Sequence, residues 1–175
     1  MLKIKSYVKV NSIEEAYELN QKKTAIVLGG MVWLKMGNRN ISTAIDLSGL
    51  GLAGIQETDE EFVIGCMTTL RELETDKRLN EYTQGAVRES VRHIVGVQFR
   101  NCATVGGSIW GRYGFSDVLT MFLGMDTWVE LHNAGKIPLT EFVDRKKDND
   151  ILVNIIVKKQ PLRVCYMSQR NTKTD

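Results

Sequence analysis

The segment Gly49–Gly54 has the glycine spacing of a dinucleotide-binding fingerprint, and it follows a short apolar strand expected at Ala44–Leu47. That fingerprint requires the glycine loop to open a helix, because the helix N-terminus receives the pyrophosphate. Here the next residues, Ile55–Glu61, contain one apolar side chain, and a strand is expected directly after them at Phe62–Cys66. The pattern therefore favours a turn between strands over a doubly wound fold, and Gly51 is expected to have no nucleotide role.

The other elements are expected to be short and to change type often. Two capping boxes, Ser12–Glu15 and Thr69–Glu72, each open a helix, and the first helix is expected to end near Asn20. Apolar residues at i, i+4, i+7 and i+8 over Val87–Val95 predict an amphipathic helix that Gly96 ends. Ser116 is expected to cap a further helix, whose apolar face would carry Val118, Leu119, Phe122 and Leu123.

Apolar runs bounded by turn residues predict the strands. These lie at Thr24–Leu28, Ala44–Leu47, Phe62–Cys66, Thr127–His132, Gly135–Ile137, Ile151–Val157 and Leu162–Met167. A strand–helix–strand order at the front and a strand-rich second part are typical of an α+β fold with two lobes.

Composition narrows the classes of function. A chain of 175 residues with 43% apolar side chains can bury a core without a disulfide or a metal. Its net charge of +2 gives no support to a nucleic-acid or membrane surface. The longest uncharged apolar stretch, Ala25–Leu34, is too short to span a bilayer, and the N-terminus lacks the apolar core of a signal peptide. A cytoplasmic protein is therefore expected.

Cysteine and histidine usage argues against metal centres. The three cysteines, Cys66, Cys102 and Cys165, form no C-x-x-C pair, and the chain has only two histidines. Neither a zinc site nor a protein-ligated iron–sulfur cluster is expected, and the thiols are interpreted as small buried hydrophobes. No nucleophile–base arrangement stands out, so no catalytic residue is assigned and any chemistry is expected to come from a cofactor.

Two other glycine-rich segments are candidates for anion binding. Gly29–Gly30 ends an apolar strand, where amides without side chains can point at a phosphate; a plain tight turn is the alternative. Thr104–Ser108 offers hydroxyl groups beside glycine amides, and a side chain at Gly106 is expected to enter the phosphate space. Asp117 follows a helix cap, so it either favours the helix dipole or accepts hydrogen bonds from a ribose.

Several segments together resemble one known family. They are Ile26–Gly30, Ile45–Ser48, Ile64–Leu70, Arg100–Ser108 and Ser116–Asp117, and the resemblance runs in order through the whole chain. The pattern is similar to the FAD-binding subunit or domain of molybdenum hydroxylases, of the xanthine dehydrogenase, carbon monoxide dehydrogenase (medium subunit) and nicotinate dehydrogenase types. The segment that begins Arg-Asn-x-Ala-Thr-Val-Gly-Gly is its most specific part.

The resemblance implies an α+β, two-lobed FAD-binding domain of the vanillyl-alcohol-oxidase or PCMH type. A small N-terminal β-α-β lobe is expected over residues 1–55, and a larger lobe with an antiparallel sheet over residues 56–167. Residues 168–175 are expected to be a tail or the start of the C-terminal lobe that the family usually carries.

The resemblance also implies FAD as the cofactor and assigns its site. Two loops would surround the pyrophosphate, one carboxylate would bind the ribose–adenine side, and one residue of the antiparallel sheet would contact the cofactor. In that order, the residues are Ile26, Val27, Leu28, Gly29, Gly30, Met31, Val32 and Trp33 with Thr104, Val105, Gly106, Gly107 and Ser108, then Asp117, then Leu152. No metal ligand is assigned.

The function implied is electron transfer within a multi-subunit molybdenum hydroxylase. FAD would pass electrons between the clusters of an iron–sulfur subunit and an external acceptor, NAD or another, while a molybdenum-cofactor subunit hydroxylates the substrate. Two alternatives stay open: a cofactor-free assembly or interaction module, and a flavoenzyme similar to UDP-N-acetylenolpyruvoylglucosamine reductase.

The chain departs from the family pattern in two places. Met31–Trp33 follow the first glycine pair where the family usually has polar residues, which removes side-chain hydrogen bonds to a phosphate. The sequence also ends at Asp175, where the family's further lobe would begin. Weak FAD binding and self-association are therefore expected.

Overall fold

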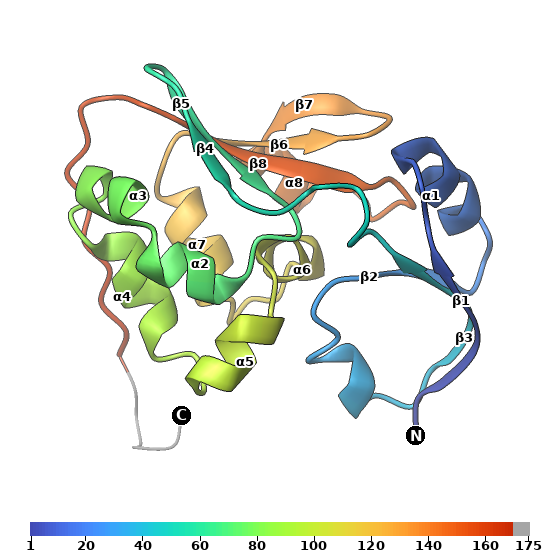
Figure 1. The fold of residues 1–175 in the computed structure, drawn as a ribbon. Helices are drawn as coiled ribbons and strands as arrows, with labels where there is room; N and C mark the ends of the chain where they lie inside the picture. Colours follow the sequence, from blue (N-terminus) through green and yellow to red (C-terminus); the bar gives the residue numbers. More distant parts are fainter. Residues whose placement is uncertain (170–175) are drawn as a thin grey trace.

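The computed structural model describes residues 1–169, and its N-terminal part is a small parallel sheet with one helix (Figure 1). The sheet has the order β1-β3-β2, and α1 connects β1 to β2. The bounds are β1 (Lys3–Lys9), α1 (Ile13–Asn20), β2 (Ala25–Leu28), a 3₁₀ turn η1 (Leu34–Met36) and β3 (Asn40–Asp46). Ser12 caps α1 by accepting a hydrogen bond from the Glu15 amide, as the capping box predicts.

The larger part is built on a five-stranded antiparallel sheet of order β4-β5-β8-β6-β7. The strands are β4 (Ile55–Glu57), β5 (Glu61–Gly65), β6 (Thr127–Leu131), β7 (Gly135–Pro138) and β8 (Leu152–Lys158). The central strand β8 pairs Ile155 with Ile64 of β5 on one side and with Val129 of β6 on the other. All three side chains are buried, so this pairing joins distant parts of the chain through the core.

Short helices pack beneath this sheet in the view of Figure 1 and complete the core. They are α2 (Leu70–Thr75), α3 (Lys77–Tyr82), α4 (Ala86–Arg92), α5 (Val97–Cys102), α6 (Val105–Gly111), α7 (Asp117–Leu123) and α8 (Leu139–Asp144). Their fully buried side chains, among them Leu73, Val87, Ile109 and Phe122, meet Phe62 and Ile64 of the sheet. The α+β prediction is confirmed. Within residues 1–169, no helix has the length and hydropathy to cross a bilayer.

The helix predicted over Val87–Val95 is shorter than its apolar pattern. Val87 and Val91 are buried as expected, but α4 ends at Arg92. Val95 has a φ of 51° and a side chain that is 79% exposed. A β-branched residue in this left-handed region cannot continue a right-handed helix, and Gly96 caps the start of α5 instead of ending α4.

Two other predictions need correction. In α7, Val118, Leu119 and Phe122 are buried as expected, but the fourth buried side chain is Met121, and Leu123 is 37% exposed. The segment Leu162–Met167 forms no strand, although its even-numbered residues are half-buried and its odd-numbered ones exposed. The alternation indicates an extended chain with one face packed against the core. A β-strand also needs a neighbouring strand to which its backbone can hydrogen-bond. This segment runs past α3 and α4 instead (Figure 1).

Several elements were not expected from the sequence: β1, η1, β4, α3, α5, α6 and α8. Thr104–Ser108, predicted as a loop, is the cap and first turn of α6, where Thr104 Oγ1 accepts a hydrogen bond from the Gly107 amide at 3.1 Å. Residues 168–175 were expected to be a tail or the start of a further lobe. From residue 170 onward, this segment lies outside the described residues.

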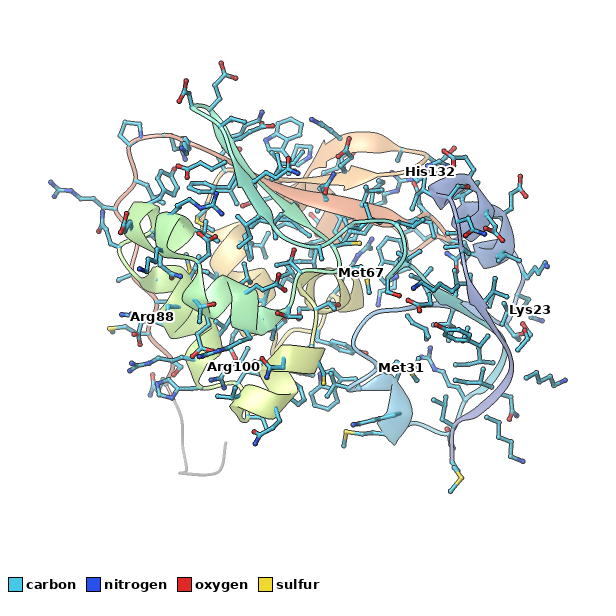
Figure 2. All side chains as sticks on the ribbon, in the orientation of Figure 1. Lys23, Met31, Met67, Arg88, Arg100 and His132 are labelled. Atoms are coloured by element: carbon cyan, nitrogen blue, oxygen red, sulfur yellow. The ribbon has the colours of Figure 1, made fainter. Side chains whose placement is uncertain are left out.

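A buried ion pair joins α2 to α5. Arg100, labelled in Figure 2, is 5% exposed and donates from Nε to Glu74 Oε2 at 2.7 Å. Arg71 also contacts Glu74 at 2.8 Å. Burial raises the pKa of Glu74, but the hydrogen bonds and charges of Arg100 and Arg71 outweigh it, so the pKa lies below the ordinary value.

This pair predicts acid sensitivity. Because the folded-state pKa of Glu74 is depressed, its contribution to stability is full above the ordinary carboxyl range and is lost as the pH falls through the folded-state pKa. We expect Glu74→Gln to cost about 2 kcal/mol at neutral pH, the scale of a hydrogen bond to a charged group, and to flatten the acid limb of the plot of stability against pH. Urea melts of both proteins across the acid range measure this. Parallel acid limbs would contradict the assignment.

Candidate functional site

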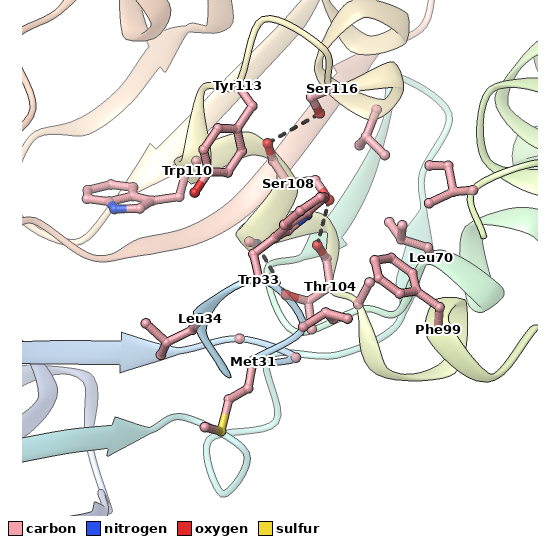
Figure 3. Close-up of a pocket in the computed structure, with 18 of the residues that line it drawn as sticks. Met31, Trp33, Leu34, Leu70, Phe99, Thr104, Ser108, Trp110, Tyr113 and Ser116 are labelled. Carbon is pink, nitrogen blue, oxygen red and sulfur yellow. Dashed lines mark hydrogen bonds between the residues drawn. The ribbon is translucent and has the colours of Figure 1, made fainter. Parts of the chain in front are cut away.

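Two cavities adjoin where the N-terminal lobe meets the larger lobe. The larger cavity, about 460 Å³, lies between the β2–β3 connection and the helices α6 and α7 (Figure 3). The smaller cavity, about 280 Å³, lies between β2 and the start of β8. Gly29, Thr104, Gly107 and Trp110 line both, so the cavities meet at the end of β2 and the first turn of α6. Their sizes are in the range of small-molecule sites.

Gly29 and Gly107 form the junction between the cavities. A Cβ atom on Gly29 would lie 2.7 Å from Thr104 Oγ1 and 3.7 Å from the Gly107 Cα. A Cβ on Gly107 would meet only Thr104 Oγ1 at 3.1 Å and would otherwise face open space. Gly29 therefore packs closely on the first turn of α6, whereas the Cβ direction of Gly107 is open to whatever occupies the junction.

The neighbouring glycines have a different role. A Cβ on Gly30 would lie 1.8 Å from the Cys102 carbonyl oxygen. The absence of a side chain therefore allows the N-terminal lobe to pack closely against the end of α5. A Cβ on Gly106 would lie 2.5 Å from the Cys66 carbonyl oxygen. A side chain at Gly106 would thus enter the protein backbone rather than a phosphate space, which corrects the expectation for this position.

The two glycine-rich segments also differ in their free amides. Within residues 1–169, the backbone amides of Gly29–Trp33 donate no hydrogen bond to the protein. In α6 the amides of Val105 and Gly106 donate to the Thr68 and Cys66 carbonyls, both at 2.8 Å. The Gly107 amide is taken by its cap hydroxyl. The first loop therefore offers unused donors, whereas the second offers hydroxyl groups and bare glycine surface.

Three aromatic rings contact one another beside the larger cavity. Trp33 of the first loop has its ring centre 6.4 Å from that of Tyr113 and 5.6 Å from that of Phe115. The rings of Tyr113 and Phe115 stack at 5.2 Å. All three residues are exposed and line the larger cavity (Figure 3). They form an apolar clasp between the lobes in place of the polar residues that the first loop lacks.

A carboxylate and an apolar residue mark the far parts of the cavities. Asp117, in the first turn of α7, lines the larger cavity, and its Oδ1 accepts a hydrogen bond from the Tyr166 hydroxyl. Leu152, at the start of β8, lines the smaller cavity. The two residues come from different elements of the second lobe and line different cavities, which meet at the glycine junction.

Every residue assigned from the sequence lines one or both cavities except Val105, whose side chain is fully buried in the core. Leu28 and Gly106 line only the smaller cavity. The sequence did not assign several other lining residues, namely Arg39, Leu70, Ile94, Phe99, Trp110, Tyr113 and Phe115. Only Trp110 had a usable signal, because it lies two residues after the second glycine segment.

The cysteines are not all buried. Cys66 is buried, and burial raises the pKa of its thiol to about 12, so it stays protonated. Cys102 and Cys165 are exposed, which corrects the expectation that all three are small core hydrophobes. Among residues 1–169, no three histidine, cysteine or acidic side chains gather as a metal site.

Comparison with known proteins agrees with this geometry. The model of the family described as "FAD binding domain in molybdopterin dehydrogenase" matches residues 2–159. The alpha subunit of the 6-hydroxypseudooxynicotine dehydrogenase complex of Paenarthrobacter nicotinovorans is 27% identical over 170 residues, covering 89% of this chain and 57% of that protein. The uncharacterized protein YgfM of Escherichia coli K12 is 26% identical, covering 93% of this chain and 62% of its own.

Solved structures with the same fold include dehydrogenases. The cyanide-inactivated Cu,Mo-CO dehydrogenase superposes with a TM-score of 0.81 at 23% identity, covering 92% of this chain and 61% of that one. Quinoline 2-oxidoreductase from Pseudomonas putida 86 gives a TM-score of 0.80 at 18% identity, covering 89% of this chain and 59% of that one. The chain thus spans about 60% of the length of the relatives it matches.

Proposed function

Because this chain belongs to the family of FAD-binding domains in molybdopterin dehydrogenases, we propose that it binds FAD along its two cavities. The pyrophosphate would lie at the junction of Gly29 and Gly107. The adenosine half would lie in the larger cavity with Asp117 at its ribose, and the other half would reach toward Leu152 in the smaller cavity. The FAD would link partner iron–sulfur clusters to an external electron acceptor.

The observation that carries the proposal is the set of unused amides in the first loop. Five successive residues, Gly29–Trp33, keep their N–H groups free of protein acceptors within the described chain. Amides of half-buried residues such as Gly29–Val32 are normally paired, so a run of free donors beside a cavity indicates an acceptor supplied from outside. A pyrophosphate provides such acceptors, and backbone donors already in place lose little order on binding it.

The glycine junction supplies the space that a diphosphate needs. Gly29 and Gly107 present no side chain there, while Thr104 and Ser108 bring hydroxyl groups to the same place. Ser108 Oγ donates to the Thr104 carbonyl at 3.1 Å and can rotate toward a new acceptor. The open surface of Gly107 and the two hydroxyl groups would together receive the diphosphate.

The chain's residues bind and shield the cofactor, and FAD supplies the redox chemistry when bound by accepting and releasing electrons. The Trp33–Tyr113–Phe115 clasp would exclude water from the pyrophosphate, which strengthens its hydrogen bonds to the loop. Relatives in this family include subunits of dehydrogenase complexes. This chain would accordingly work with an iron–sulfur subunit and a molybdenum-cofactor subunit.

The test is FAD binding followed by electron transfer. Titration of the purified chain with FAD, followed by calorimetry and by tryptophan fluorescence, should show saturable binding with one FAD per chain. The loaded chain, co-expressed with an iron–sulfur subunit of the same enzyme class, should have its flavin bleached when that subunit is reduced. Absence of binding would refute the cofactor assignment. Binding without bleaching would refute the electron-transfer role.

A substitution in the Gly49–Gly54 segment is expected to leave FAD binding unchanged. Gly51 has a φ of 68° with open space around its Cβ position, and it lines neither cavity. We expect Gly51→Ala to cost about 1 kcal/mol, since an alanine is strained in this conformation, and to leave FAD affinity unchanged. A calorimetric titration compares the two proteins. A clear loss of FAD from folded Gly51→Ala would return this segment to the site.

A further inference from the structure

We propose that Tyr166 is a positioning residue for the cofactor: its hydroxyl holds the Asp117 carboxylate in the orientation that receives the ribose. The inference rests on the proposed FAD site, because it concerns the carboxylate assigned to the ribose there. Its basis is the hydrogen bond from the Tyr166 hydroxyl to Asp117 Oδ1, which joins residues 49 positions apart in the chain.

The hydrogen bond leaves room for a ligand on the same carboxylate. Within residues 1–169, Asp117 Oδ2 accepts no hydrogen bond. An ionised carboxylate accepts at about four lone-pair positions, so one phenol does not saturate it. Tyr166 therefore fixes one oxygen and leaves the other available to a ligand, and Asp117 lines the larger cavity.

No neighbour on α7 performs this task for Asp117. The adjacent Ser116 hydroxyl accepts the Leu119 amide at 3.2 Å as the helix cap and faces the Ser108 carbonyl at 3.5 Å. Asp117 itself would rotate about two side-chain torsions. A phosphate nearby would favour the rotamers that point away, because like charges repel. The phenol opposes this by holding the carboxylate beside the cavity.

The tyrosine is itself held in place by the segment that follows β8. Tyr82, at the end of α3, accepts the Gln160 amide at 3.0 Å, and Gln84 Nε2 donates to the Leu162 carbonyl at 3.1 Å. Leu162, Val164 and Tyr166 then pack as half-buried side chains against the core. The alternation that suggested a strand is thus the means by which this segment presents Tyr166 to α7.

Orientation before binding favours affinity, because a fixed carboxylate loses less rotational freedom when the ribose arrives. The consequence is specific to ligands with ribose hydroxyl groups. Wild-type protein should prefer ADP over 2′,3′-dideoxy-ADP, and loss of the Tyr166 hydroxyl should reduce this preference without affecting the fold.

The test compares four variants: Tyr166→Phe, Asp117→Ala, the double variant, and Tyr7→Phe as a matched control. The Tyr7 hydroxyl also donates to an aspartate, Asp46, but lines neither cavity. We expect Tyr166→Phe to weaken FAD binding about fivefold to tenfold, the scale of one ordinary hydrogen bond. Its preference for ADP over the dideoxy analogue should fall with it. Tyr7→Phe should bind FAD as tightly as wild type. In the Asp117→Ala background, Tyr166→Phe should weaken FAD binding no further.

The outcomes separate this inference from the proposed function. If wild type binds FAD and Tyr166→Phe binds equally well, or if the two variants are additive, Tyr166 does not act through Asp117 and the inference fails alone. If wild type fails to bind FAD, both fall together. A melting temperature shared by Tyr166→Phe and Tyr7→Phe shows that any difference between them comes from the site.

Discussion

Gly30→Ala is expected to lower the free energy of unfolding by about 3 kcal/mol, which corresponds to a melting temperature about 6–12 °C lower for a domain of this size. The added Cβ would lie 1.8 Å from the Cys102 carbonyl oxygen and 2.9 Å from the Ala103 Cα. Both neighbours belong to the backbone, so no side chain can rotate to make space. The lobes would have to separate locally.

The matched control is Gly114→Ala, because a Cβ there meets no atom within 4 Å and the backbone is not left-handed. Urea melts of the three proteins measure the difference. We expect Gly114→Ala to stay within about 0.5 kcal/mol of wild type. Equal stability of Gly30→Ala and Gly114→Ala would mean that the lobes do not pack at Gly30.

Gly107→Val is expected to weaken FAD binding about 100-fold, or ~2.7 kcal/mol, while the protein stays folded. Its Cβ would meet only the Thr104 hydroxyl at 3.1 Å and would otherwise extend into the space where the cavities join. The side chain therefore excludes a pyrophosphate without displacing backbone. Gly107→Ala, which adds one methyl group, should show a smaller loss.

Calorimetric titration with FAD, beside a thermal melt, separates binding from folding. Gly114→Ala again serves as the control, since Gly114 lines neither cavity. Full FAD affinity in a folded Gly107→Val protein would remove the glycine junction from the site. By contrast, Gly106→Val is expected to unfold, because its side chain would enter the Cys66 backbone.

Local sequence signals predicted local structure well. Ser12 and Thr69 cap their helices as their capping boxes indicate, since a cap depends on residues three positions apart. The apolar pattern over Val87–Val95 was less informative, because hydrophobic spacing does not report backbone dihedrals. Val95 keeps the spacing and leaves the helix. Leu162–Met167 keeps strand alternation, and the missing partner strand is a matter of topology.

The site shows the same limit. The residues assigned by family resemblance lie together except for Val105, but neighbouring glycines with the same local sequence have opposite roles. Gly107 faces the open junction, whereas Gly106 packs on the Cys66 backbone, and only the fold distinguishes them. Tyr113 and Tyr166 have no sequence signal, because each acts through a contact with a distant part of the chain.

A two-dimensional ¹H–¹⁵N NMR titration of the labelled chain with FAD reports directly on the amides of the first loop. Gly29–Trp33 have free amides, whereas the Val105 and Gly106 amides are already bonded to the protein. We predict that the largest shifts fall on Gly29–Trp33, that they saturate at one FAD per chain, and that Val105 and Gly106 shift little. Saturation with the first-loop amides unmoved, or no shift at any FAD concentration, would contradict the proposed site.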